Sequence, residues 1–243
     1  MSDRRILVLY SQKKERLSEE DKKSEELGDR WTYLNVLPRS GFIHTVHHGK
    51  RNKKETQKFI KKVKQNSDGL APLFLSDGWK EYPCAILEQY STWNEETQKR
   101  EIAPNLNYAQ VVKIKENGRL SAIEKRVIFG SEKEILRIIK EEGRGEQMNT
   151  SYVESRNGKY RKDNKRLTRK TMCHSKKVKV HDAHIDWMTG VYNFCREIPA
   201  FRVCFKKKGK RFEVRYKKRS PAMLEGMVPK ILSLQEFLML RIC

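Results

Sequence analysis

The chain has 243 residues, of which 53 are Lys or Arg and 31 are Asp or Glu, so its formal net charge is +22. Apolar residues make up 37 % of the chain, and no stretch reaches the roughly 18 to 20 consecutive apolar residues of a membrane span, which excludes a membrane protein. Five cysteines without a CxxC pair exclude a structural zinc knuckle and a disulfide-stabilised secreted scaffold, and they favour a reducing cytoplasm.

Short apolar runs alternate with amphipathic segments over the first 142 residues, which predicts strands mixed with helices. The predicted strands are 6–10, 30–37, 41–47, 72–76, 108–114 and 123–129. The predicted helices are 53–65, 82–90 and 132–142, and residues 91–106 are predicted to be polar and irregular. Turn residues at 38–41 and at Asn117-Gly118 join neighbouring strands into hairpins.

The second part of the chain is predicted to be mainly helical. A long helix begins near Thr150 or Ser151, either of which can cap it, and another covers 180–196. The tail after Ser220 contains enough apolar residues to dock on the body. We expect a mixed sheet flanked by helices in residues 1–200, in an order that matches ribonuclease-H-like folds, and a basic helical C-terminal region in 201–243.

The positive charge is concentrated in two blocks. Residues 156–180 contain 11 basic residues and one acid, and residues 202–219 contain 10 basic residues and one acid, so together they supply 19 of the 22 net charges. Aromatic residues lie between the basic ones, as at Tyr160 and Tyr216. A solvated basic face is the simpler interpretation of one such run, but two dense blocks favour a nucleic-acid surface.

Two acidic residues lie at positions where an α/β fold of this kind carries catalytic groups. Asp77 follows the apolar run 73–75 after one serine, and Glu154 lies near the start of the long basic helix, where it shares a face with Asn157 and Arg161. An acid beside Asn and Arg suits a metal-bound phosphodiester. The simpler alternatives are an ordinary Asp-Gly turn and an ordinary surface charge pair. A zinc site at His181 and His184 is disfavoured, because their spacing fits no zinc pattern.

Several segments resemble the DDE transposases of the insertion-sequence-one-like group. SDGWKEYPCAI at 76–86 is similar to the second-aspartate motif of that group, and NTSYVESRNGKYRKDNKRLTRKT at 149–171 is similar to its glutamate helix. Residues 28–51 resemble its second and third strands, and 192–197 and 219–227 resemble its C-terminal helix and tail. The first aspartate of the group lies in an Asp-Glu-x-Trp motif; here only Asp3 stands near that place, followed by Arg4.

The resemblance implies a transposase core that cleaves DNA strands and transfers them with Mg²⁺ or Mn²⁺, held by Asp3, Asp77 and Glu154. The residues implied to hold DNA are Asn157, Arg161, Lys162, Lys165, Arg166, Arg169 and Lys170. The implied partners are transposon ends, target DNA and a second copy of the chain, in the cytoplasm at the nucleoid. Because the group carries a DNA-binding region ahead of its core, the chain is expected to be a truncated copy.

Two other interpretations remain open. A degenerate, inactive relative would keep only the basic surface and bind DNA without sequence preference. A ribosome-associated or RNA-binding protein would share the charge but would not need Asp77 and Glu154.

Overall fold

The computed structural model describes residues 2–10, 28–68, 73–117, 119–141, 147–167, 173, 175, 177–206 and 214–240. The chain divides into two compact units. Unit 1 comprises Met1–Arg39 and His44–Val178, and unit 2 comprises Ser40–Ile43 and Lys179–Cys243. The boundary expected at residue 200 therefore falls inside unit 2.

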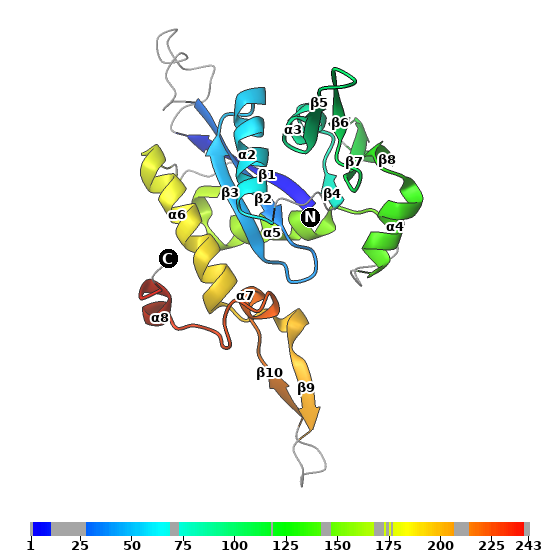
Figure 1. The fold of residues 1–243 in the computed structure, drawn as a ribbon. Coiled ribbons are helices and arrows are strands. Elements are labelled where there is room, and N and C mark those ends of the chain that lie inside the picture. Colours follow the sequence, from blue (N-terminus) through cyan, green and yellow to red (C-terminus); the bar gives the residue numbers. More distant parts are fainter. Residues whose placement is uncertain are drawn as a thin grey trace. The chain divides into compact units, whose positions relative to one another are not determined.

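Unit 1 is built on a mixed sheet, in which the described residues form six strands in the order β3-β2-β1-β4-β7-β8 (Figure 1). The strands are β1 (Ser2–Tyr10), β2 (Gly28–Val36), β3 (Ile43–Gly49), β4 (Leu73–Ser76), β7 (Asn107–Glu116) and β8 (Arg119–Phe129). β1 runs antiparallel to β2 and parallel to β4, and β4 runs parallel to β7. β7 and β8 are antiparallel neighbours, as the Asn117-Gly118 signal predicts. The predicted mixed sheet is thus confirmed.

Helices cover both faces of this sheet, and β4 shows why. Phe74 belongs to one buried cluster with Phe59 of α2 (Lys53–Gln65) and Ile86 of α3 (Tyr82–Gln89). Its neighbours Leu73 and Leu75 belong to another cluster with Ile135 and Ile139 of α4 (Glu132–Glu141). Because successive side chains of a strand point to opposite faces, α2 and α3 lie on one face and α4 on the other.

A half-buried histidine links β3 to α2. His47 Nε2 lies 2.8 Å from Glu55 Oε2, and the His47 ring packs on Phe59 and Tyr33. Burial lowers the pKa of His47 in spite of the carboxylate beside it. Although burial acts to raise the pKa of Glu55, hydrogen bonds from Lys58 and His47 lower it overall.

The expectation of an irregular segment at 91–106 is wrong. β5 (Ser91–Asn94) and β6 (Lys99–Ile102) form an antiparallel hairpin there. The Asn94 side chain accepts the backbone N–H groups of Glu96 and Thr97, which fixes the turn. The strand signal is weak in the sequence because the hairpin is largely exposed, so it lacks the alternation of a half-buried strand.

Unit 2 contains α6 (Val178–Gly190), a π-helical turn (Val191–Cys195), α7 (Pro221–Leu224) and α8 (Leu234–Leu238). The expected helical region is therefore correct in part. The basic block at 202–219, however, contributes two antiparallel strands, β9 (Val203–Lys206) and β10 (Val214–Lys217) (Figure 1). β-Branched and aromatic residues alternate with the basic ones, as at Val214 and Tyr216, and this pattern favours strands over a helix.

Candidate active site at the carboxyl end of β4

Asp77 lies in a tight turn that packs against β7. The Asp77 Oδ1 atom accepts the backbone N–H of Trp79 at 3.3 Å, and Gln110 Nε2 donates to the Trp79 carbonyl oxygen at 3.3 Å. A Cβ atom on Gly78 would approach Val112 Cγ2 to 2.9 Å, so the turn leaves little space for a side chain. The Asp77 side chain is half-buried, and its position after β4 agrees with the sequence analysis.

Glu154 reaches the same strand from a helix. It lies in the first turn of α5 (Ser151–Asp163), and Glu154 Oε1 accepts a hydrogen bond from Lys113 Nζ of β7. Each of the two side chains is 34 % exposed. Lys113 directly follows Val112, which Gly78 approaches, so the Asp77 turn and Glu154 contact successive residues of β7. Because successive side chains of a strand point to opposite faces, these two contacts lie on opposite faces of β7.

Lys113 is not among the residues predicted from the sequence. Its only signal is its place in β7, two residues after Val111 and four after Ala109, which both belong to the cluster around α4. A lysine at the end of such a series lies on the face that carries α4.

Asp3 lies in β1, which is longer than the predicted 6–10 strand. In the sheet register Asp3 pairs with Asn35 of β2 and with Ser76 of β4, one residue before Asp77. Ser76 in turn pairs with Gln110 of β7, so polar residues occupy one row across four strands. The side chain of Asp3 lies outside the described residues.

The row is hydrogen-bonded on the β4 and β7 side. Ser76 Oγ lies 2.8 Å from Tyr108 Oη, and Gln110 Nε2 donates to Tyr108 Oη at 2.8 Å. Asn35 is 1 % exposed, and its Oδ1 atom has no hydrogen-bond partner among the described residues. A buried amide without a partner is costly, so this part of the row has unused capacity to bind a donor.

The predicted DNA-binding residues differ in exposure. Asn157 is 5 % exposed, so it packs inside unit 1 and does not present a surface amide. Arg161 is half-buried, whereas Lys162 is exposed at the end of α5. The helix ends at Asp163, and the exposed Lys165 and Arg166 lie in a 3₁₀ turn after it; Arg169 and Lys170 lie outside the described residues.

An arginine stacked between two tryptophans lies in the same unit. The Arg51 guanidinium carbon is 4.7 Å from the Trp31 ring centroid and 4.1 Å from the Trp79 ring centroid. The Trp79 Nε1–H donates to Thr56 Oγ1 at 3.1 Å. These contacts anchor the residue two positions after Asp77 to β2 and α2, which stabilises the turn that holds the carboxylate.

The ligand atoms that these side chains offer are of the kind that a hard divalent cation prefers. Asp77 and Glu154 offer carboxylate oxygens, which Mg²⁺ and Mn²⁺ prefer. Among the side chains that the structure describes, no three His, Cys, Asp or Glu residues cluster as a metal site, and His181 is buried in α6. The Asp3 side chain, the third expected ligand, is outside that search.

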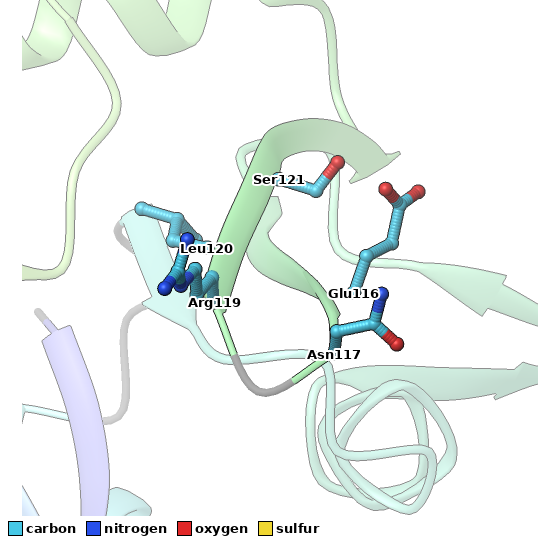
Figure 2. A pocket seen from close by; sticks show the side chains of 5 residues that line it. All are labelled: Glu116, Asn117, Arg119, Leu120 and Ser121. Atoms are coloured by element: carbon cyan, nitrogen blue, oxygen red, sulfur yellow. The ribbon is translucent and has the colours of Figure 1, made fainter.

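A surface pocket lies away from these residues, at the turn between β7 and β8. It is lined by Glu116, Asn117, Arg119, Leu120 and Ser121 (Figure 2). None of the predicted site residues lines it, so it adds nothing to the chemistry at β4.

Comparisons with protein families, with curated proteins and with solved structures find no match for this chain. No helix in the described part of the chain is long and apolar enough to cross a membrane.

Proposed function

We propose that this chain is the catalytic core of a metal-dependent DNA transposase with a ribonuclease-H-like sheet. The observation that carries the proposal is that Asp77 directly follows β4, and that Glu154 of α5 accepts a hydrogen bond from Lys113 of β7, the strand parallel to β4. The mixed sheet β3-β2-β1-β4-β7-β8, with β1, β4 and β7 parallel and helices on both faces, supports it, because a ribonuclease-H-like core is expected to be a mixed sheet flanked by helices. In an open sheet of this kind, binding sites form beyond the carboxyl ends of parallel strands.

Asp77, Glu154 and Asp3 would hold the divalent cations. When bound, Mg²⁺ or Mn²⁺ would supply activation of the attacking hydroxyl and stabilisation of the leaving oxygen. The Trp79 N–H orients the Asp77 carboxylate through its hydrogen bond to Oδ1. Lys113 orients Glu154 and places a positive charge where a phosphate would approach. Lys162, which is exposed at the end of α5, would hold the DNA backbone.

The test is strand transfer of pre-cut DNA ends in Mg²⁺ or Mn²⁺. We expect Asp77→Asn and Glu154→Gln each to lower the rate by more than the about 10- to 100-fold that loss of an outer-shell group costs at a metal site. Glu141→Gln is the matched control, because Glu141 is an exposed carboxylate of α4 paired with Arg137. Equal activity of wild type and both site variants would contradict the proposal.

A second candidate, DNA binding without catalysis, is favoured by the charge distribution. Nineteen of the 22 net charges lie in two blocks, and in the second block Tyr216 is 54 % exposed beside the exposed Lys217. Exposed aromatic and basic residues side by side suit stacking and phosphate contacts. A chain that binds DNA but transfers no strand in either metal would be this degenerate form.

A further inference from the structure

β8 forms one edge of the six-stranded sheet, and within the described residues no strand pairs with its outer side. Its apolar side chains are unusually accessible for a strand of 11 residues. Leu120 is 54 % exposed, Ile123 51 % and Val127 38 %. A long edge strand with accessible apolar residues is a template for pairing with another strand.

The middle of β8 is regular. Its pairing with β7 is uninterrupted from Ala122 to Val127, and irregularities lie outside that range at both ends. Ile123 and Val127 are four residues apart and share one face, while Glu124 and Arg126 share the other. Glu124 and Arg126 also form an ion pair within the chain at 2.5 Å.

This stretch is complementary to itself in antiparallel orientation. When Lys125 lies on a two-fold axis, Glu124 of each copy faces Arg126 of the other, and Ile123 faces Val127. An axis at Glu124 instead places Glu124 of one copy opposite Glu124 of the other, and an axis at Arg126 does the same with the two arginines, so like charges face each other. An axis at Ile123 or at Val127 leaves Glu124 and Arg126 opposite residues that do not carry the complementary charge.

The pairing about Lys125 has one unfavourable contact, between the two lysines on the axis. Lys125 Nζ already donates to Gln147 Oε1 at 3.1 Å, which draws each ammonium group toward its own chain. Two ion pairs and two apolar pairs remain, each of a kind that stabilises neighbouring strands.

We propose that β8 pairs with β8 of a second copy, antiparallel and centred on Lys125, to form a two-fold dimer with one continuous sheet. A two-fold axis makes the interface isologous, so every contact occurs twice. The assignment does not depend on the proposed chemistry, because it rests on the exposure, register and charges of β8 alone.

Charge reversal tests the pairing by sedimentation of the full chain over a concentration series. Glu124→Arg creates two contacts between like positive charges across the axis, and Arg126→Glu creates two between like negative charges. We expect each variant to dimerise about tenfold more weakly than wild type, because two attractive contacts become repulsive. An equal mixture of the two variants should dimerise again, since a wholly basic pair of positions in one copy then faces a wholly acidic pair in the other.

The mixture distinguishes two explanations for weaker dimerisation: a lost contact between copies and a lost ion pair within one chain. Only a contact between copies can be restored by mixing. The matched control is Glu134→Arg mixed with Arg137→Glu, which reverses an exposed ion pair on α4. These variants should dimerise like wild type, alone and together. A wild type that stays monomeric, or single variants that dimerise normally, would overturn the proposal.

Cross-linking tests the register. Residues directly opposite each other on neighbouring antiparallel strands have Cβ atoms about 4.5–5.5 Å apart, so a short amine-reactive reagent should join Lys125 to Lys125. A link between identical residues can arise only between two copies. A wild-type dimer that lacks this link while other lysines are linked between copies would reject the pairing centred on Lys125.

Discussion

Lys113 Nζ of β7 donates a hydrogen bond to Glu154 Oε1 of α5. The lysine ammonium group is therefore already bound to one carboxylate oxygen of Glu154, which is a proposed metal ligand. A divalent ion at Glu154 has to share this carboxylate with the ammonium group. Because like charges repel, Lys113 lowers the affinity of the site for metal while it keeps Glu154 oriented.

We therefore expect Lys113→Met to bind Mn²⁺ more tightly than wild type, by up to about tenfold for an ion pair that is one-third exposed. Titration calorimetry or the magnetic resonance signal of free Mn²⁺ measures this directly. Lys125→Met is the control, because Lys125 contacts the neutral Gln147. Unchanged Mn²⁺ affinity in Lys113→Met would show that Glu154 does not hold the metal.

Asp3 is predicted to be the first catalytic acid. Its backbone is paired with β2 on one side and β4 on the other, which places it within one residue of Asp77 in the register. Asp3→Ala should lower Mg²⁺-dependent nicking and strand transfer of pre-cut ends. Robust activity in this variant would identify another residue as the first acid, and Asp29 is the next candidate to replace.

DNA affinity should fall steeply with salt and depend little on sequence. If about six to ten basic side chains neutralise phosphates, raising salt from 50 to 200 mM costs on the order of 10³- to 10⁵-fold in affinity. Replacing five basic residues of the second block with Gln should reduce the slope by several units. The five are Lys206, Lys207, Lys208, Lys210 and Arg211.

The control for this experiment removes the same charge elsewhere. Five exposed lysines of unit 1 are replaced with Gln: Lys53, Lys54, Lys61, Lys80 and Lys99. We expect a smaller change in slope from this set. A salt response that is flat in wild type, or a strong preference over scrambled competitors, would mean that the basic blocks are not the main DNA surface.

His47 should make the protein less stable in mild acid. Since its pKa is lowered by folding, the unfolded chain binds the proton more readily, and the contribution of His47 to stability is complete only above its ordinary pKa. This contribution is lost as the pH falls from about 7 to about 5. The lowered pKa of Glu55 acts in the same direction at still lower pH.

His47→Gln should flatten the loss of unfolding free energy between about pH 7 and pH 5, measured by denaturant titration. His44→Gln is the control, because the ring of His44 lies on the same strand and contacts the Asn66 carbonyl oxygen in place of a carboxylate. A variant at His47 that retains the full wild-type pH dependence would assign the acid sensitivity to another group.

Two glycines in helical backbone should respond in opposite ways to alanine. A Cβ atom on Gly190 would lie 2.4 Å from Phe237 Cζ, so Gly190→Ala has to displace a ring that also stacks on Phe194. We expect a loss of about 1–3 kcal/mol. Gly158 in α5 has open space at the same position, so Gly158→Ala should gain about 0.5–1 kcal/mol. Thermal unfolding of the two variants beside wild type measures both effects.

Most of the sheet of unit 1 is predictable from the sequence, because its strands are apolar and its turns carry strong signals. The helix at 53–65 agrees residue for residue with α2, since Asn52 caps it and Phe59, Ile60 and Val63 define one buried face. The strands β9 and β10 are harder to predict, because both are only four residues long, and β10 has a basic residue in every other position in place of an alternation between buried and exposed apolar residues.

The candidate site was predictable only in part. Asp77 follows a buried strand, and Glu154 begins a helix, so each has a local signal. Lys113 lacks one, because its importance arises from an ion pair with Glu154, which is 41 residues away in the sequence. Helical spacing predicts that Asn157 shares a face with Glu154 and Arg161, but it does not say which face of the helix is buried, and Asn157 is 5 % exposed.

The four residues Ser40–Ile43 have a consequence for the biosynthesis of this protein. They belong to unit 2 although they connect β2 with β3 of unit 1. The Asn193 side chain binds both backbone groups of Ile43, donating to its carbonyl oxygen at 2.9 Å and accepting its N–H at 3.0 Å. The ribosome therefore synthesises this short segment 150 residues before Asn193, its hydrogen-bond partner. A fragment that starts at Lys179 would lack these four buried residues of unit 2. Unit 2 can therefore complete its folding only after Asn193 has left the ribosome.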